Sequence, residues 1–109
     1  MFYSFDLTVP ADTAEGSFVE LVADVAPGLF HRVEIQFPPG CRGLVHVRVL
    51  HSLHQVWPAN PDGDFATDGT VIGWNEAWEL VDEPDQLRLQ GWSPGTVFPH
   101  VITFRFGVV

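Results

Sequence analysis

The chain contains no lysine and few basic side chains of any kind. Apart from five histidines, its basic residues are five arginines, which face 14 carboxylates and leave a formal net charge of -9. Nucleic-acid binding needs clustered positive charge to neutralise phosphates, so five scattered arginines argue against a nucleic-acid partner. The same imbalance argues against docking on an anionic membrane surface. The absence of lysine also excludes Schiff-base and P-loop chemistry.

Cysteine pairs and long apolar runs are missing too. Cys41 is the only cysteine, so no intrachain disulfide can form and the fold must depend on packing. No stretch approaches the roughly 18 apolar residues of a transmembrane helix. The first residues, Met1 to Asp6, lack the basic region and continuous apolar region of a secretory signal. We therefore expect a soluble protein, cytoplasmic or virion-associated, that is not secreted by a signal peptide.

The residues that are present indicate one folded domain over residues 1–109. A hydrophobic fraction of 46% is enough to form a core. Nine prolines and ten glycines are too many for a helical bundle, because each tends to end or kink a helix. Distributed along the chain, they separate short segments of the kind that form strands.

Alternation of apolar and polar residues is the dominant pattern. It is clear in residues 3–9, 32–37, 45–50 and 98–108, while residues 17–25 favour a strand over a helix because glycine and proline flank them. We expect an all-β fold, an antiparallel β-sandwich of jelly-roll or Ig-like type with about seven or eight strands. Residues expected to be buried together are Phe5, Leu7, Val33, Ile35, Val45, Val47, Leu89, Ile102 and Phe104.

Two of these runs, residues 32–37 and 45–50, are separated only by the sequence Pro-Pro-Gly-Cys-Arg-Gly. That spacing predicts a hairpin with a longer loop. The first and last runs occupy the two ends of the chain, and terminal strands are often sheet edges that invite pairing with another chain.

The longest irregular segment, residues 52–69, contains three aspartates beside glycines: Asp62, Asp64 and Asp68. Calcium takes oxygen ligands from flexible loops, so a calcium site is one interpretation. Counted from Asp64, Gly69 fits the EF-hand template, but the closing position holds Asn75 in place of glutamate. The other interpretation is that these aspartates only make tight turns. No other cofactor or metal is indicated.

Four tryptophans divide into two pairs. Trp74 and Trp78 share the parity of apolar neighbours, so at least one should lie in the core. Trp57 and Trp92 stand at the edges of loops, where an exposed ring would suit a protein interface or stacking on a sugar. The alternative is that each ring simply packs against the fold.

No catalytic constellation emerges. His46, His51 and His54 have no zinc-ligand spacing, and no serine lies in a nucleophile-elbow sequence. Arg42 beside Cys41 could lower the pKa of that thiol, yet no signature of a cysteine enzyme accompanies it. We expect no enzymatic activity.

In size, in lacking a signal peptide and in lacking a cysteine framework, the chain is similar to small β-sandwich accessory proteins of tailed-phage particles. The resemblance is one of class and implies a non-enzymatic structural or interaction protein that forms a homo-oligomer or docks on a larger assembly. Its interface would draw on one terminal strand and the tryptophan-containing loops. The alternative is a carbohydrate- or small-ligand-binding module that uses Trp57, Trp92, Asp62, Asp64 and Asp68.

Overall fold

The computed structural model describes residues 1–109 and confirms that the chain is all-β. It has eight strands and one turn of 3-10 helix. No helix in it has the length and apolar character needed to cross a bilayer. The elements are β1 (Phe2–Val9), η1 (Glu15–Ser17), β2 (Val19–Asp24), β3 (Gly28–Phe37), β4 (His46–His51), β5 (His54–Trp57), β6 (Thr70–Leu80), β7 (Gln86–Trp92) and β8 (His100–Val108).

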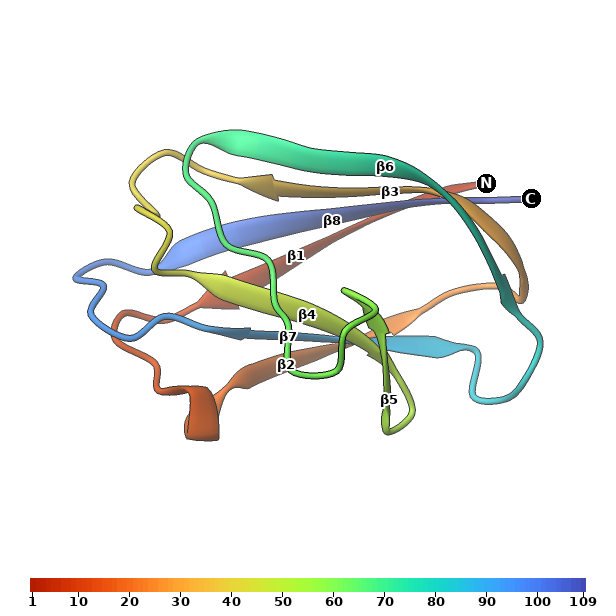
Figure 1. Ribbon diagram of the computed structural model, residues 1–109, viewed down its shortest axis with the longest axis horizontal. Coiled ribbons are helices and arrows are strands. Elements are labelled where there is room, and N and C mark those ends of the chain that lie inside the picture. Colours follow the sequence, from red (N-terminus) through yellow and green to blue (C-terminus); the bar gives the residue numbers. More distant parts are fainter.

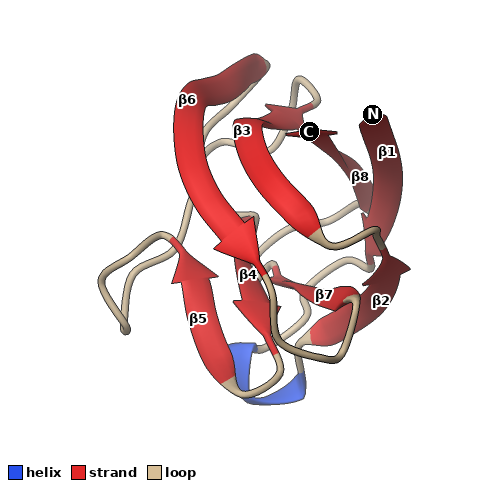
Figure 2. Cartoon of the chain, turned by 90° about the vertical axis from the view of Figure 1, so that its right-hand side faces the viewer, coloured by secondary structure: helices blue, strands red, loops and turns tan.

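The strands form two four-stranded antiparallel sheets, ordered β1-β8-β3-β6 and β2-β7-β4-β5. The pairing is nested: β1 pairs with β8, β2 with β7, β3 with β6 and β4 with β5. Figure 1 shows both termini at the same end of the molecule. In Figure 2 the two sheets lie as separate layers, with β5 and β6 on one side and β1 and β2 on the other.

The predicted hairpin between β3 and β4 is wrong, because the two strands belong to different sheets. Each edge of β3 is already taken, by β6 and β8, and each edge of β4 by β5 and β7. The connecting residues therefore carry the chain from one sheet to the other. Alternation fixed which side chains point inward, but it carries no information about the neighbouring strand.

A single cluster of buried apolar side chains lies between the sheets. Eight of the nine residues expected in the core belong to it, and the ninth, Phe5, is half-buried and packs against it. Ile35 and Phe104 are directly opposite each other in neighbouring strands, and both are fully buried. The inward parity of the alternating runs is thus confirmed.

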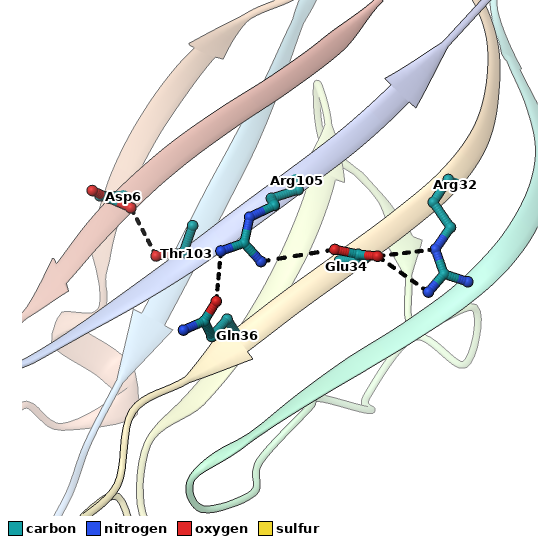
Figure 3. A network of polar contacts seen from close by, with 6 residues as sticks. All are labelled: Asp6, Arg32, Glu34, Gln36, Thr103 and Arg105. Atoms are coloured by element: carbon teal, nitrogen blue, oxygen red, sulfur yellow. Dashed lines mark hydrogen bonds and ion pairs between the residues drawn. The ribbon is translucent and has the colours of Figure 1, made fainter.

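The outer face of the first sheet is covered by a polar network that extends over its strands (Figure 3). Thr103 donates to Asp6 at 2.8 Å, and Arg105 pairs with Glu34 at 3.7 Å. Arg32 pairs with the same Glu34 at 3.2 Å. A Cβ at Gly73 would lie 2.7 Å from the Arg32 guanidinium, so the glycine leaves room for this arginine to lie across β6. Both arginines of this face are therefore paired within the chain, and the Asp6 carboxylate is held by a hydroxyl.

Candidate functional site

A groove of about 680 Å³ opens at the end of the molecule opposite the termini. Its walls come from the β3–β4 connection, residues 38–44, and from residues 95–101 before and at the start of β8. In Figure 1 these two loops lie at the left-hand end. The volume falls within the range of about 300–1,000 Å³ that is typical of ligand pockets.

Apolar side chains around this groove are unusually exposed. The exposed fraction is 77% for Val97, 70% for Phe98, 44% for Val101 and 37% for Leu44. A contiguous apolar surface on a folded chain commonly marks an interaction site. Alternation placed Phe98 on the apolar side of the last strand, but β8 begins only at His100, so the ring stands in a loop. The groove was missed for that reason.

Arg42 is the only arginine in this groove, and its side chain makes no hydrogen bond or ion pair within the chain. The other four arginines are all engaged. Arg88 pairs with Glu20 at 2.9 Å and Arg48 donates to Gln90 at 2.7 Å, while Arg32 and Arg105 share Glu34. The charge of Arg42 acts on the nearby Asp68 carboxylate, but the guanidinium forms no ion pair with it, so its hydrogen-bond donors stay free. It gives the groove a local preference for a negative group.

His100 adds a second unsatisfied group to the groove wall. Its Nδ1 atom is buried and has no hydrogen-bond partner, which is rare for a buried polar atom. A Cβ at Gly40 would lie 3.6 Å from the other ring nitrogen, so the imidazole packs against the β3–β4 loop. Guanidinium and imidazole thus both remain without partners here.

Asp68 supports this loop from outside. Its carboxylate accepts a hydrogen bond from the amide of Gly40 at 2.8 Å. The backbone amides of Arg42, Gly40 and Cys41, together with the charge of Arg42, lower the pKa of Asp68. The aspartate therefore stays ionised and holds the loop that carries Arg42.

The other sequence-predicted site residues lie elsewhere. Asp64 pairs with His46 at 2.8 Å, and Asp62 is exposed in a turn. No group of three or more His, Cys, Asp or Glu side chains could hold a metal ion. The structure therefore does not bring Asp62, Asp64 and Asp68 together: Asp62 lies in a turn, Asp64 pairs with a strand residue and Asp68 bonds to the β3–β4 loop.

Trp57 and Trp92 are not exposed rings, since each is only 4% accessible. Trp57 ends β5 and joins the core, where its indole N–H donates to Glu76 at 2.7 Å. Trp92 lies on the outer face of the second sheet. His46 stacks on it at a centroid distance of 5.7 Å, and the Arg48 guanidinium lies 4.7 Å from its ring centre. Neither indole has a face free for a sugar.

Glu76 sits between Trp57 and Trp74, which both donate to the same carboxylate oxygen, at 2.7 and 3.0 Å. The other oxygen accepts from the amide of Ala77 at 2.9 Å. Burial raises the pKa of Glu76, but the hydrogen bonds from Trp74, Ala77 and Trp57 outweigh it and hold the pKa below its ordinary value. Both oxygens of this charge are thus hydrogen-bonded within the chain, by three donors in all.

Cys41 and the histidines offer no reactive centre. Cys41 is fully buried, and burial followed by the charge of Asp68 raises the pKa of its thiol, contrary to the lowering expected from Arg42. His51 and His54 do meet across the β4–β5 turn, yet no third ligand joins them. His51 bonds instead to the carbonyl of Pro84 at 2.9 Å.

Comparisons with known proteins identify no family for the chain. No protein-family model matches it, and no curated protein sequence does. Among solved structures it is similar to a crystal structure of FLHE, with a TM-score of 0.42 and 12% identity over 96% of this chain and 95% of that one. A likeness of this size carries no conclusion about function.

Proposed function

We propose that this chain is a non-enzymatic interaction domain that holds a segment of a partner protein in the groove between residues 38–44 and 95–101. The observation that carries the proposal is the pairing of exposed apolar side chains with an arginine that the chain leaves unpaired. Aromatic residues and arginines are enriched in protein interfaces. The groove offers an aromatic residue, Phe98, and an arginine, Arg42.

The chemistry of the groove specifies the segment. Leu44, Val97 and Phe98 favour aliphatic or aromatic side chains, which they would remove from water. Arg42 favours a carboxylate, either a side chain or a chain end, because a guanidinium binds it in a bidentate way. The occupant is therefore an apolar segment with an acidic group, although the rest of this acidic surface would repel it.

We also infer that the two sheets form a β-sandwich of the jelly-roll type. The nested pairing of first with last strand, second with seventh, third with sixth and fourth with fifth supports that type over the Ig-like one. Jelly rolls occur in viral capsid and lectin domains, so the type is compatible with an assembly role like that of phage-particle accessory proteins. The fold alone does not select that role.

Carbohydrate binding through Trp57 and Trp92 loses its basis, because both rings are covered. A small-ligand module remains the competing function, but it would have to use the same groove.

Selection from a random peptide display library on the immobilised chain tests the proposal. The enriched peptides should combine Leu, Phe or Trp with Asp or Glu. General electrostatics predicts the reverse, since a surface with a net charge of -9 should enrich basic peptides. Binding of a chosen peptide should weaken about tenfold or more in Phe98→Ser and in Arg42→Gln.

Leu53→Ser is the matched control, since Leu53 is 86% exposed in the β4–β5 turn at the other end of β4. It should leave peptide affinity unchanged. Enrichment of basic peptides only, or of peptides indifferent to Phe98 and Arg42, would contradict the proposal. Groove-dependent binding of the anionic dye anilinonaphthalene sulfonate without any peptide would favour the small-ligand module instead.

A further inference from the structure

Four strands lie at sheet edges, and their free backbone groups could pair with another chain. Three of these edges carry features that prevent it. The first, β6, has the charged Glu76 pointing inward and bonded to Trp57 of the opposite sheet. An inward charge on an edge strand is one of the devices that block edge-to-edge pairing.

The two edges of the second sheet are blocked differently. Strand β5 has four residues, its register with β4 is irregular, and Pro58 follows it directly. Strand β2 has six residues, of which Glu20 and Asp24 are acidic. Short length, irregularity, proline and charged side chains all oppose pairing with a second strand.

Strand β1 has fewer of these protections. Its eight residues pair with β8 in unbroken register and include no proline and one charged side chain, Asp6. Met1 exchanges both backbone hydrogen bonds with Val108, at 2.6 and 2.7 Å. In an antiparallel ladder the bonding alternates, so the amides and carbonyls of Phe2, Ser4, Asp6 and Thr8 face the free edge.

We propose that a second copy of this chain docks on the free edge of β1, antiparallel to it and related by a two-fold axis at Phe5. In this register Phe2 lies opposite Thr8 of the second copy, and Ser4 lies opposite its Asp6. Each such pair exchanges two backbone hydrogen bonds. The two four-stranded sheets then join into one continuous sheet through an isologous interface.

Two observations select this register. A shift by two residues that moves the two-fold axis to Asp6 would place Asp6 directly opposite its own copy, and like charges facing each other across strands destabilise the pair. The chosen register instead gives Asp6 the hydroxyl of Ser4. On the inward face it brings together the half-buried Phe5 rings, and Tyr3 with Leu7, which lie closest across a pair without hydrogen bonds. The second copy would thus cover the half-buried aromatic side chains of this edge.

The test is static light scattering or analytical ultracentrifugation over a dilution series with charge variants of β1. Ser4→Asp places two new like-charged pairs against Asp6 of the second copy and should weaken dimerisation roughly two- to thirtyfold. Ser4→Lys places opposite charges there and should strengthen it by a similar factor. Thermal melting of each variant verifies that the fold is intact.

Thr8→Asp and Thr8→Lys are the matched controls. They change the net charge by the same amounts on the same strand, but Thr8 faces Phe2 of the second copy, so both shifts should be smaller than at Ser4. A wild-type chain that stays monomeric at millimolar concentration overturns the proposal. So does a dimer in which substitutions at Ser4 and Thr8 have equal effects, because general charge repulsion would explain that result.

Discussion

Two regions of this molecule bring aromatic rings beside a charged group, and they differ in whether the chain completes the charge's hydrogen bonding. Between β5 and β6, Glu76 accepts from two indoles and an amide, and Trp57 is 4% exposed. At the groove, Arg42 has no partner and Phe98 is 70% exposed. A charge whose bonds are all made inside the chain stabilises the fold, whereas one left open is available to a partner.

Truncating one ring in each region gives the largest contrast. Trp57→Ala should lower the free energy of unfolding by about 3–5 kcal/mol, because it removes a buried indole and leaves a cavity. Phe98→Ala should change it by less than about 0.5 kcal/mol, as surface substitutions usually do. Urea denaturation followed by circular dichroism measures both. Equal losses would mean that Phe98 is part of the core and not of a binding surface.

Removing the charge of Glu76 should have the next largest effect. Glu76→Gln keeps the shape of the side chain but replaces the ionised acceptor of the wild type by a neutral amide, which weakens the hydrogen bonds. We expect the free energy of unfolding to fall by about 1–3 kcal/mol at neutral pH. Glu79→Gln is the control, because Glu79 lies three residues further on the same strand and is exposed. It should leave the free energy of unfolding nearly unchanged.

The pH dependence of that loss follows from the lowered pKa of Glu76. A carboxyl whose pKa is lower in the folded state stabilises the fold above its unfolded value, about 4.3 for glutamate. The contribution disappears as the pH falls through the folded pKa. The difference between wild type and Glu76→Gln should therefore be full near neutrality and shrink in acid. A difference that grew in acid would contradict the assignment of these hydrogen bonds.

Alternation in the sequence predicted the inward side chains well, because one face of each strand must be buried to form a core. The runs around Leu7, Ile35, Val47 and Phe104 all have the predicted parity. Strand partners could not be predicted the same way. The Pro-Pro-Gly segment after β3 is compatible with a hairpin or with a crossing between sheets, and only competition with β6 and β8 decides between them.

The candidate site was less predictable, because exposure depends on contacts between segments far apart in the chain. The sequence places Trp92 at the edge of a loop, but in the structure His46 and Arg48 of another strand cover its ring. The alternating pattern predicts that Phe98 belongs to a strand, but the strand starts two residues later. One signal was available: Val97 and Phe98 form an apolar pair between Pro94 and Pro99, where a turn needs no apolar side chains.

The smallest expected effect concerns Asp68, which links the aspartate-rich segment to the groove. Its carboxylate holds the amide of Gly40 in the loop that carries Arg42. Asp68→Ala should therefore increase hydrogen exchange at the Gly40 amide and weaken peptide binding about two- to fivefold, the effect of one exposed hydrogen bond. Asp68→Asn keeps an acceptor without the charge, so its exchange rate and peptide affinity should lie between those of the wild type and of Asp68→Ala.

Asp62→Ala provides the matched control, because it removes the same charge from an exposed turn in the same segment. It should alter neither the exchange of Gly40 nor peptide affinity. The lowered pKa of Asp68 means that its support is present above the ordinary aspartate value, about 3.9, and is lost only as the pH falls through the lower folded pKa. Protection of Gly40 in the wild type should thus persist in mild acid. If Asp62→Ala and Asp68→Ala act alike, the loop responds to net charge, and Asp68 has no specific part in holding the groove open.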